Sequence, residues 1–387
     1  MEKSVGQLTE ADELFCHQTT ETFANVATSD PAWTERAYGC VIAKDDGFAL
    51  HWGLGKYVNR NVMDGFAGIA IGRTQRNVRF SRRLAPRPMD MAVGPFRLEV
   101  VEPLKATRAI LEPTEHQPIS FDITQRVIDR PWQEDRSVVT RGYRTVQEDM
   151  RYVLCTEATG WVEVEGRRIA IEAPGGFGFR DHSWGIKQNT GPASPETPDR
   201  GRMPVGLQYR LIWSPCVLTL PDGQPYRLHM FCWETHSARG SQIVNESKIF
   251  APGPSGGVQH VRETRFDLRY DPATREPLGG HMLLVLRDGS ERPIHIEIAG
   301  QSRVCLGMGL YNGYGGHYHG EARGALHVEG DMLPDTGDPA ACEAVHQLRD
   351  ILIRVSDPVT GGTGWGILNT EITGAWPDLG LQDANWR

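Results

Sequence analysis

The sequence lacks long hydrophobic runs and paired cysteines. No uninterrupted apolar stretch approaches the ~20 residues that a membrane helix needs, and Met1–Ser4 lead into polar sequence without the hydrophobic core of a signal peptide. Seven cysteines are scattered singly, and no Cys-x-x-Cys occurs. Such cysteines are typical of reduced thiols that act as small core residues. We therefore expect a cytoplasmic protein without a membrane span.

An excess of positive charge is also absent. The formal net charge is −8, and an acidic surface repels phosphate backbones, which argues against nucleic acid as the main partner. Apolar content of 39% with 43 glycines and 25 prolines indicates a compact, turn-rich protein. A length of 387 residues makes two domains the default expectation. The composition does not decide between a monomer and a homodimer.

Motifs for nucleotides and for serine hydrolases are missing. The glycine-rich segments 175–178 and 307–309 have no lysine at P-loop spacing and no strand-helix-strand context. Asp181, His182 and Ser183 do not make a hydrolase triad, because adjacent strand residues cannot form that chain of hydrogen bonds and no Gly-x-Ser-x-Gly elbow surrounds Ser183. We expect no cofactor.

Strand patterns dominate what is present. Apolar residues alternate on both sides of short turns, which predicts hairpins, and the run 96–101 also reads as a strand. Helical patterns are few and do not alternate with strands, which argues against a parallel α/β sheet. The hairpins span 160–171, 217–233 and 282–298, and the helices are expected at Leu8–Phe15 and Pro339–Arg349.

These patterns predict an all-β fold of two antiparallel barrels with few short helices. The segment 188–201 contains three prolines and reads as a linker. We therefore place one barrel domain at residues 1–187 and a second at 188–387. Ligand sites are common where two domains meet, and the linker begins just after the segment Asp181–Gly185.

That segment, Asp-His-Ser-Trp-Gly, carries the clearest chemistry. In an extended strand His182 and Trp184 share one face, and Asp181 and Ser183 share the other. The imidazole of His182 can give or take a proton near neutral pH, and Trp184 offers a flat apolar wall. A bulge could re-aim Asp181 toward His182. The simpler alternative is a hydrogen-bonded core histidine at the end of a strand.

Tyr209 lies in the strand-like run 205–213. If that strand pairs beside the motif strand, the phenol of Tyr209 joins His182 and donates to a substrate oxygen. The alternative is a buried tyrosine whose hydroxyl is satisfied within the fold.

A second cluster spans residues 311–321. His317, His319 and Glu321 fall on one face if the segment is a strand, where they could bind Zn or Fe. The same side chains could instead line a metal-free site together with Tyr311 and Tyr314, or serve the structure alone.

The Asp181–Gly185 motif resembles the signature of the carotenoid 1,2-hydratase and AttH-like lipocalin-type superfamily. This resemblance implies two joined calycin-like barrels and a site where His182 and Trp184 act with a Tyr-x-Asp pair on a later strand. Tyr209 falls at a suitable separation, but the acid position is Leu211, which has no acidic proton to donate. The departure implies chemistry other than alkene hydration, and cyclases that work by shape and hydrogen bonding are also known in the superfamily.

The sequence thus favours a cofactor-independent acid/base enzyme, a lyase, hydratase, isomerase or cyclase, acting on a hydrophobic small molecule such as a terpenoid, steroid or lignin-type aromatic. One alternative is a non-catalytic carrier of lipophilic ligands, since barrels readily enclose them. The other is a metal enzyme built on the second cluster. The expected catalytic residues are His182, Asp181 and Tyr209, and the expected substrate-binding residues are Trp184, Tyr311, Tyr314, His317, His319 and Glu321.

Overall fold

A computed structural model describes residue 13 and residues 22–141, 143–187, 190–191, 207–238, 240–253, 256–345 and 347–383. The expected helix Leu8–Phe15, apart from residue 13, and most of the linker 188–201 lie outside these residues. Within them, no helix is long and apolar enough to cross a membrane.

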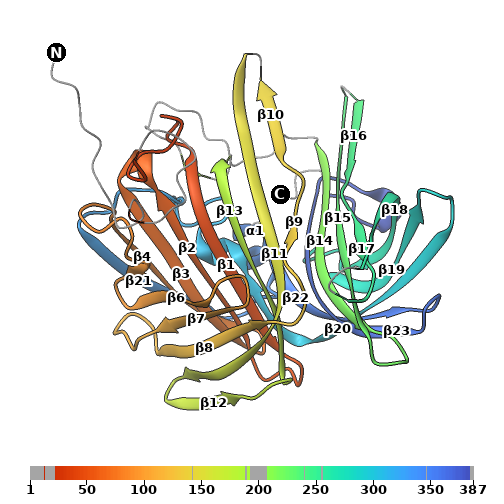
Figure 1. Ribbon diagram of the computed structural model, residues 1–387, viewed down its shortest axis with the longest axis horizontal. Coiled ribbons are helices and arrows are strands. Elements are labelled where there is room, and N and C mark those ends of the chain that lie inside the picture. Colours follow the sequence, from red (N-terminus) through yellow and green to blue (C-terminus); the bar gives the residue numbers. More distant parts are fainter. Residues whose placement is uncertain are drawn as a thin grey trace.

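The chain forms two antiparallel sheets that curl into barrels and lie side by side (Figure 1), as the sequence predicted. The first sheet has the order β21-β4-β3-β2-β1-β13-β11-β8-β7-β6-β5, and β9, β10 and β12 pair with β11. Its strands are β1 (Trp33–Ala43), β2 (Ala49–Tyr57), β3 (Val62–Ile71), β4 (Thr74–Arg83), β5 (Ala92–Val93), β6 (Phe96–Glu102), β7 (Ala106–Leu111), β8 (Ile119–Val127), β9 (Trp132–Gln133), β10 (Ser137–Arg141), β11 (Arg144–Val164), β12 (Arg167–Ile171), β13 (Gly176–Ile186) and β21 (Leu326–Leu333).

The second sheet has the order β14-β23-β22-β20-β19-β18-β17-β15-β16, and an added pairing of β14 with β15 closes it into a ring. Ring closure removes unpaired strand edges, which is why antiparallel sheets of this kind form barrels. Its strands are β14 (Gln208–Thr219), β15 (Pro225–Ser237), β16 (Gly240–Asn245), β17 (Lys248–Phe250), β18 (Val258–Tyr270), β19 (Pro277–Leu286), β20 (Glu291–Cys305), β22 (Arg349–Asp357) and β23 (Gly362–Thr373).

The three predicted hairpins are present as β11–β12, β14–β15 and β19–β20. At the first turn Glu165 and Gly166 have φ of 53° and 79°, the left-handed conformation that two-residue hairpin turns require. The predicted helix at Pro339–Arg349 is shorter than expected. It is α1 (Pro339–Ala344), with Asp338 as its N-cap and Val345 as its C-cap, and Arg349 already begins β22.

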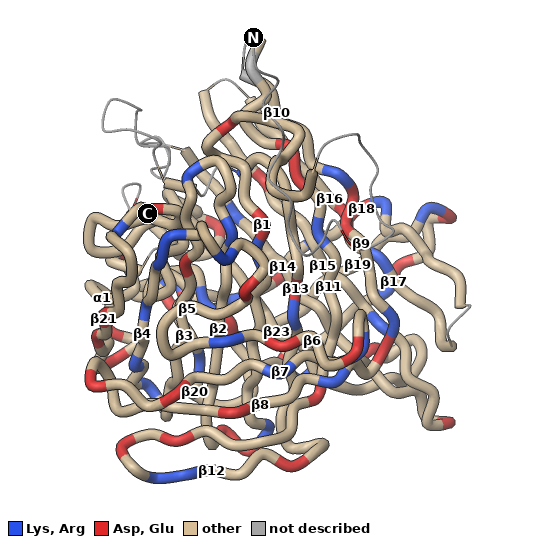
Figure 2. Tube along the Cα trace, turned by 60° about the vertical axis from the view of Figure 1, so that its left-hand side comes forward, with Lys and Arg blue, Asp and Glu red and all other residues tan. Residues whose placement is uncertain are grey.

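Short 3-10 segments occur at η2 (Val58–Arg60), η3 (Leu306–Gly309) and η4 (Pro377–Leu379). Basic and acidic residues are interspersed over the tube of the chain (Figure 2).

Alternation along each strand divides most apolar residues of the described part of the chain among three large cores, and a small fourth core holds Cys305, Met308, Leu333 and Val345. Val41 and Trp52 lie in the first-barrel core, inside the first sheet. Leu228 and Leu284 lie in the second-barrel core. A third core, the interface core, packs one sheet against the other and includes Phe179 of β13. The outer face of β13 is therefore buried by the second sheet.

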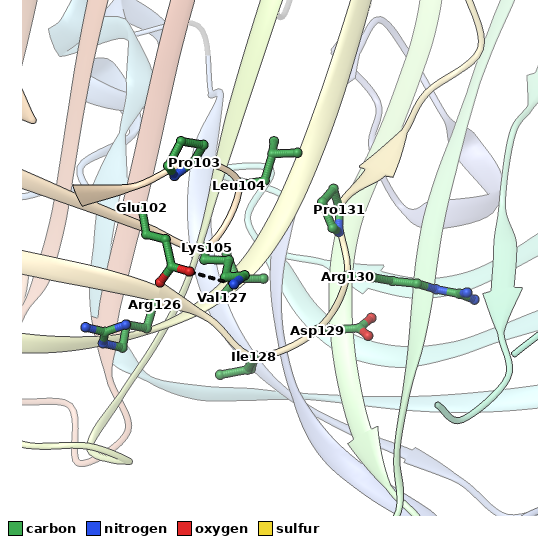
Figure 3. A pocket seen from close by; sticks show the side chains of 10 residues that line it. All are labelled: Glu102, Pro103, Leu104, Lys105, Arg126, Val127, Ile128, Asp129, Arg130 and Pro131. Carbon is green, nitrogen blue, oxygen red and sulfur yellow. Dashed lines mark hydrogen bonds and ion pairs between the residues drawn. The ribbon is translucent and has the colours of Figure 1, made fainter. Parts of the chain in front are cut away.

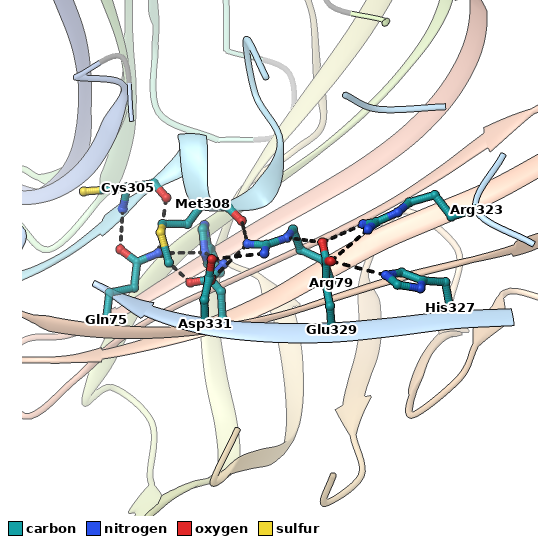
Figure 4. Close-up of polar contacts among 10 residues, drawn as sticks. Gln75, Arg79, Cys305, Met308, Arg323, His327, Glu329 and Asp331 are labelled. Atoms are coloured by element: carbon teal, nitrogen blue, oxygen red, sulfur yellow. Dashed lines mark hydrogen bonds and ion pairs between the residues drawn. The ribbon is translucent and has the colours of Figure 1, made fainter. Parts of the chain in front are cut away.

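One strand of the first sheet comes from the second half of the sequence. β21 pairs with β4 along its whole length, and a polar network fastens it there (Figure 4). Arg79 of β4 donates to Glu329 and Asp331 of β21 at 3.0 Å each and to the carbonyl of Met308 at 3.0 Å. The boundary at residue 187 thus separates the two sheets except for β21, and the domain limits themselves stay a prediction.

Candidate functional site between the two sheets

The interface between the sheets has an apolar half and a polar half. Along β13 the outward residues run from Phe177 and Phe179 to Asp181. On the facing sheet, β14 runs from Val217 and Trp213, which pack on the interface core, to Tyr209. We call the polar half the interface cluster. It comprises Tyr38, Arg151, Asp181, Tyr209, Asp350, Asn369 and Glu371.

Asp350 of β22 joins the two sheets at this cluster. Its carboxyl accepts a hydrogen bond of 2.6 Å from the Tyr38 hydroxyl of β1 and one of 2.7 Å from the Asn369 amide. Burial raises the pKa of Asp350 to about 6, because a buried carboxylate loses its hydration. Burial also raises the pKa of Asp181, while Arg151, with its Nε 3.9 Å from Asp181 Oδ2, opposes that rise.

Basic groups flank these carboxyls. Burial lowers the pKa of the Lys187 amine to about 7, and its ammonium donates to the Ser183 hydroxyl. Arg151 also lies 3.5 Å from Glu134, which accepts a hydrogen bond of 2.8 Å from the Trp213 indole. Proton donors and acceptors therefore lie together in one buried region, on the outer face of β13 and of the strands beside it.

Glu371 of β23 is the least satisfied carboxyl of the cluster. Its residue is 9% exposed, and it makes no hydrogen bond with any residue that the structure describes. Burial alone raises its pKa to about 7. Glu371 is the cross-strand partner of Leu211 and lies diagonal to Tyr209 on the same face, and its charge is one of the causes that raise the pKa of Tyr209. A carboxyl thus stands beside the position where the resemblance had placed an acid and the sequence has Leu211.

His182 lies on the other side of the first sheet. Alternation puts it opposite to Asp181, as predicted, and no register shift between β1 and β13 re-aims Asp181. Its imidazole contacts Glu35 at 2.9 Å and the Tyr152 hydroxyl at 3.1 Å. Trp184 shares its face, with ring centroids 5.7 Å apart.

The expectation that Tyr209 joins His182 is wrong. β14 pairs with β15 and β23 and not with β13, so Tyr209 belongs to the second sheet. Its side chain points to the interface, whereas His182 points to the interior of the first sheet. Sequence spacing could not reveal this, because strand neighbours are set by the barrel closure.

The second cluster is also divided. The segment 311–321 forms turns and isolated bridges, not a strand, so the expected common face does not exist. Tyr311 turns to the interface, where its ring lies 6.0 Å from that of Tyr38 and the Arg36 guanidinium lies 5.3 Å from its centroid. His319 is buried, with Nδ1 3.7 Å from a carboxylate oxygen of Asp64, and burial lowers its pKa to about 4.

The remaining members lie apart from His319. His317 contacts Glu321 at 3.0 Å, and Tyr314 packs under the Arg79 guanidinium at 5.0 Å. Among the residues described, no group of three His, Cys, Asp or Glu side chains could hold a metal ion.

Sequence reasoning missed Asp350, Glu371, Glu35 and Tyr152. One signal was available for Glu371. In the run Ile367–Ile372 Asn369 and Glu371 occur at a spacing of two, which places both on one face of the strand. The others lie in ordinary strand sequence and carry no motif.

A separate hollow of about 630 Å³ lies at the β6–β7 turn and the segment after β8 (Figure 3). Its walls include Leu104, Val127 and Ile128, and Lys105 is paired with Glu102 at 2.6 Å. No member of the interface cluster lines this hollow.

A model of the family described as "Family of unknown function (DUF8625)" matches residues 8–382, so the chain belongs to this family. A search of curated proteins found no match.

Solved structures similar to this chain include a protein assigned as AttH from Nitrosomonas europaea, with 10% identity, a TM-score of 0.49, and 87% of this chain and 92% of that chain covered. CghA with Sch210972 has 10% identity and a TM-score of 0.48, with 88% and 89% covered. Kievitone hydratase from Nectria haematococca has 11% identity and a TM-score of 0.41, with 87% and 88% covered.

Proposed function

We propose that this DUF8625 protein is a cofactor-independent acid/base enzyme of the lyase, hydratase, isomerase or cyclase class, acting on a hydrophobic small molecule at the interface between its two sheets. The observation that carries the proposal is Glu371, a carboxyl group that is 9% exposed and has no hydrogen-bond partner among the described residues. With a pKa of about 7, it holds its proton over much of the neutral range and can release it. General acids work best with a pKa near the working pH.

The surroundings of Glu371 suit an apolar substrate. Phe179 and Trp213 belong to the interface core, beside the polar half, and their rings would bind the hydrocarbon part. Tyr209, beside Glu371, would donate a hydrogen bond to a substrate oxygen. Glu371 would then transfer its proton to the substrate, and Asp181, on the opposite sheet, would accept a proton from the substrate or from attacking water. Exchange with water would return both carboxyls to their starting states.

The proposal is tested by proton transfer itself, without knowledge of the natural substrate. Wild-type protein is incubated in D2O with a panel of terpenoid alkenes and steroid enones, and mass spectrometry follows deuterium uptake and addition of water. We expect turnover of at least one class and a fall of roughly 10²-fold or more in Glu371→Gln. Glu297→Gln, which changes an exposed carboxylate of β20, is the matched control. Full activity of Glu371→Gln would contradict the assignment.

The carrier alternative predicts a different result from the same panel. A carrier would bind the apolar compounds without deuterium uptake, and Glu371→Gln would retain their affinity. Tight binding with no exchange across the panel therefore favours the carrier over the enzyme.

A further inference from the structure

The inner face of β13 carries a second group of polar and aromatic side chains that the proposed function does not use. Arg180, His182 and Trp184 occupy alternate positions there. In register with them on β1 are Gly39, Ala37 and Glu35. Ala37 packs on the first-barrel core, so this face is the inside of the first sheet.

Three rings form the wall of this group. Tyr152 of β11 is the cross-strand partner of His182. The centroid of the Tyr152 ring lies 5.4 Å from that of the His182 ring and 6.4 Å from that of the Trp184 ring. The side chain of His182 is 31% exposed to solvent, and that of Glu35 is 49% exposed. The rings are therefore accessible, not sealed in packing.

The same face carries a buried cation, Arg180, without a counter-charge among the described residues. Arg180 is 5% exposed, and its guanidinium makes no hydrogen bond or ion pair with a residue that the structure describes. Its Cζ lies 5.9 Å from the centroid of the Tyr152 ring. Glu35, the carboxylate of the group, is held by His182 instead. A buried charge without a partner is costly, and an anionic ligand group would remove that cost.

We propose that the inner face of β13 binds an aromatic carboxylate, with the ligand's ring against Tyr152 and Trp184 and its carboxylate on Arg180. The guanidinium presents its donors in a fork that matches a carboxylate. Aromatic walls with one buried charge are typical of small-molecule sites. The Glu35–His182–Tyr152 hydrogen-bond chain fixes the Tyr152 ring over Arg180. This site lies on the opposite side of the sheet from the interface cluster and does not depend on the proposed function.

The test compares a carboxylate with its neutral analogue on the full-length protein. Calorimetry measures binding of 2-naphthoate and of 2-naphthalenemethanol. A charged hydrogen bond contributes about 1.5–3 kcal/mol, so we expect 2-naphthoate to bind roughly 10-fold to 100-fold more tightly than the alcohol. In Arg180→Met the two should bind equally, and the ligand-free variant should melt at a higher temperature than wild type, since an unpaired buried charge is gone.

Two controls keep the result interpretable. Arg168→Met removes another arginine that stacks on an aromatic ring, Trp161 at 3.7 Å, on an exposed hairpin, and should leave 2-naphthoate binding unchanged. Arg180→Lys keeps the charge and should retain a preference for the carboxylate, which covers the case in which Arg180→Met does not fold. The proposal is overturned if wild type shows no preference for 2-naphthoate, or if folded Arg180→Met binds it as wild type does.

Discussion

Replacing Glu371 with glutamine should change how stability depends on pH. Glutamine keeps the size of the protonated acid but cannot ionise. The folded state raises the pKa of Glu371 from 4.5 to about 7, and one pKa unit corresponds to about 1.4 kcal/mol, so the full effect is roughly 3 kcal/mol. Because the residue is 9% exposed, solvent screening reduces this little.

The sign follows from proton binding. Between pH 4.5 and about 7 the folded protein holds the Glu371 proton while the unfolded chain releases it, so the free energy of unfolding of wild type falls as pH rises through this window. Glu371→Gln lacks this fall. The two proteins should be equally stable near pH 4, and the variant should be more stable by roughly 3 kcal/mol above pH 7.

Urea unfolding of both proteins at a series of pH values measures the difference directly. Other titrating groups, such as Asp350 and His319, are present in both and cancel when one curve is subtracted from the other. The carbonyl stretch of a protonated carboxylic acid in the infrared difference spectrum gives an independent readout. A flat difference curve between pH 4 and pH 8 would refute the reasoning, since it would mean that Glu371 is ionised in the folded protein.

Three further predictions concern stability and composition. Tyr38→Phe removes a donor from buried Asp350 and should lower the free energy of unfolding by about 1–3 kcal/mol, whereas Tyr143→Phe, at a fully exposed tyrosine, should not. Arg79→Met removes the arginine that pairs with Asp331 and Glu329 of β21, while Glu329 keeps Arg323 and His327. The free energy of unfolding should therefore fall by about 1–3 kcal/mol, with faster proteolysis at β21; unchanged stability would contradict the role of this network. Elemental analysis should find no stoichiometric Zn or Fe, because His319 turns inward to Asp64; a stoichiometric metal would revive the metal-enzyme alternative.

The fold was largely predictable, because alternation and turn chemistry are local. The Glu165–Gly166 turn and the strand patterns beside it determine a hairpin without help from the rest of the chain. The same alternation correctly separated His182 from Asp181. What could not be predicted were contacts set by strand order. Tyr209 was assigned to His182 on the assumption that the strands before and after the linker are neighbours, yet β14 pairs with β23, which lies more than a hundred residues further along.

The candidate site was harder to predict, because its seven members come from six strands. Tyr38, Arg151, Asp181, Tyr209 and Asp350 stand on β1, β11, β13, β14 and β22, and Asn369 and Glu371 stand on β23. Only the packing of one barrel on the other brings them together. The prediction for the second cluster, residues 311–321, was wrong for a different reason. Its glycines Gly313, Gly315 and Gly316 take positive φ angles, which break an extended segment into turns.

The pairing of β21 with the first sheet affects how the chain folds during synthesis and which fragments can be expressed. A ribosome synthesises residues 1–187 long before Leu326–Leu333 emerges, so β4 spends that time with an unpaired edge. A nascent chain of the first half alone would expose this edge to other chains, and an expression fragment ending near residue 187 should aggregate for the same reason. Supplying Leu326–Leu333 as a separate peptide offers a route to rescue such a fragment, in the manner of donor-strand complementation.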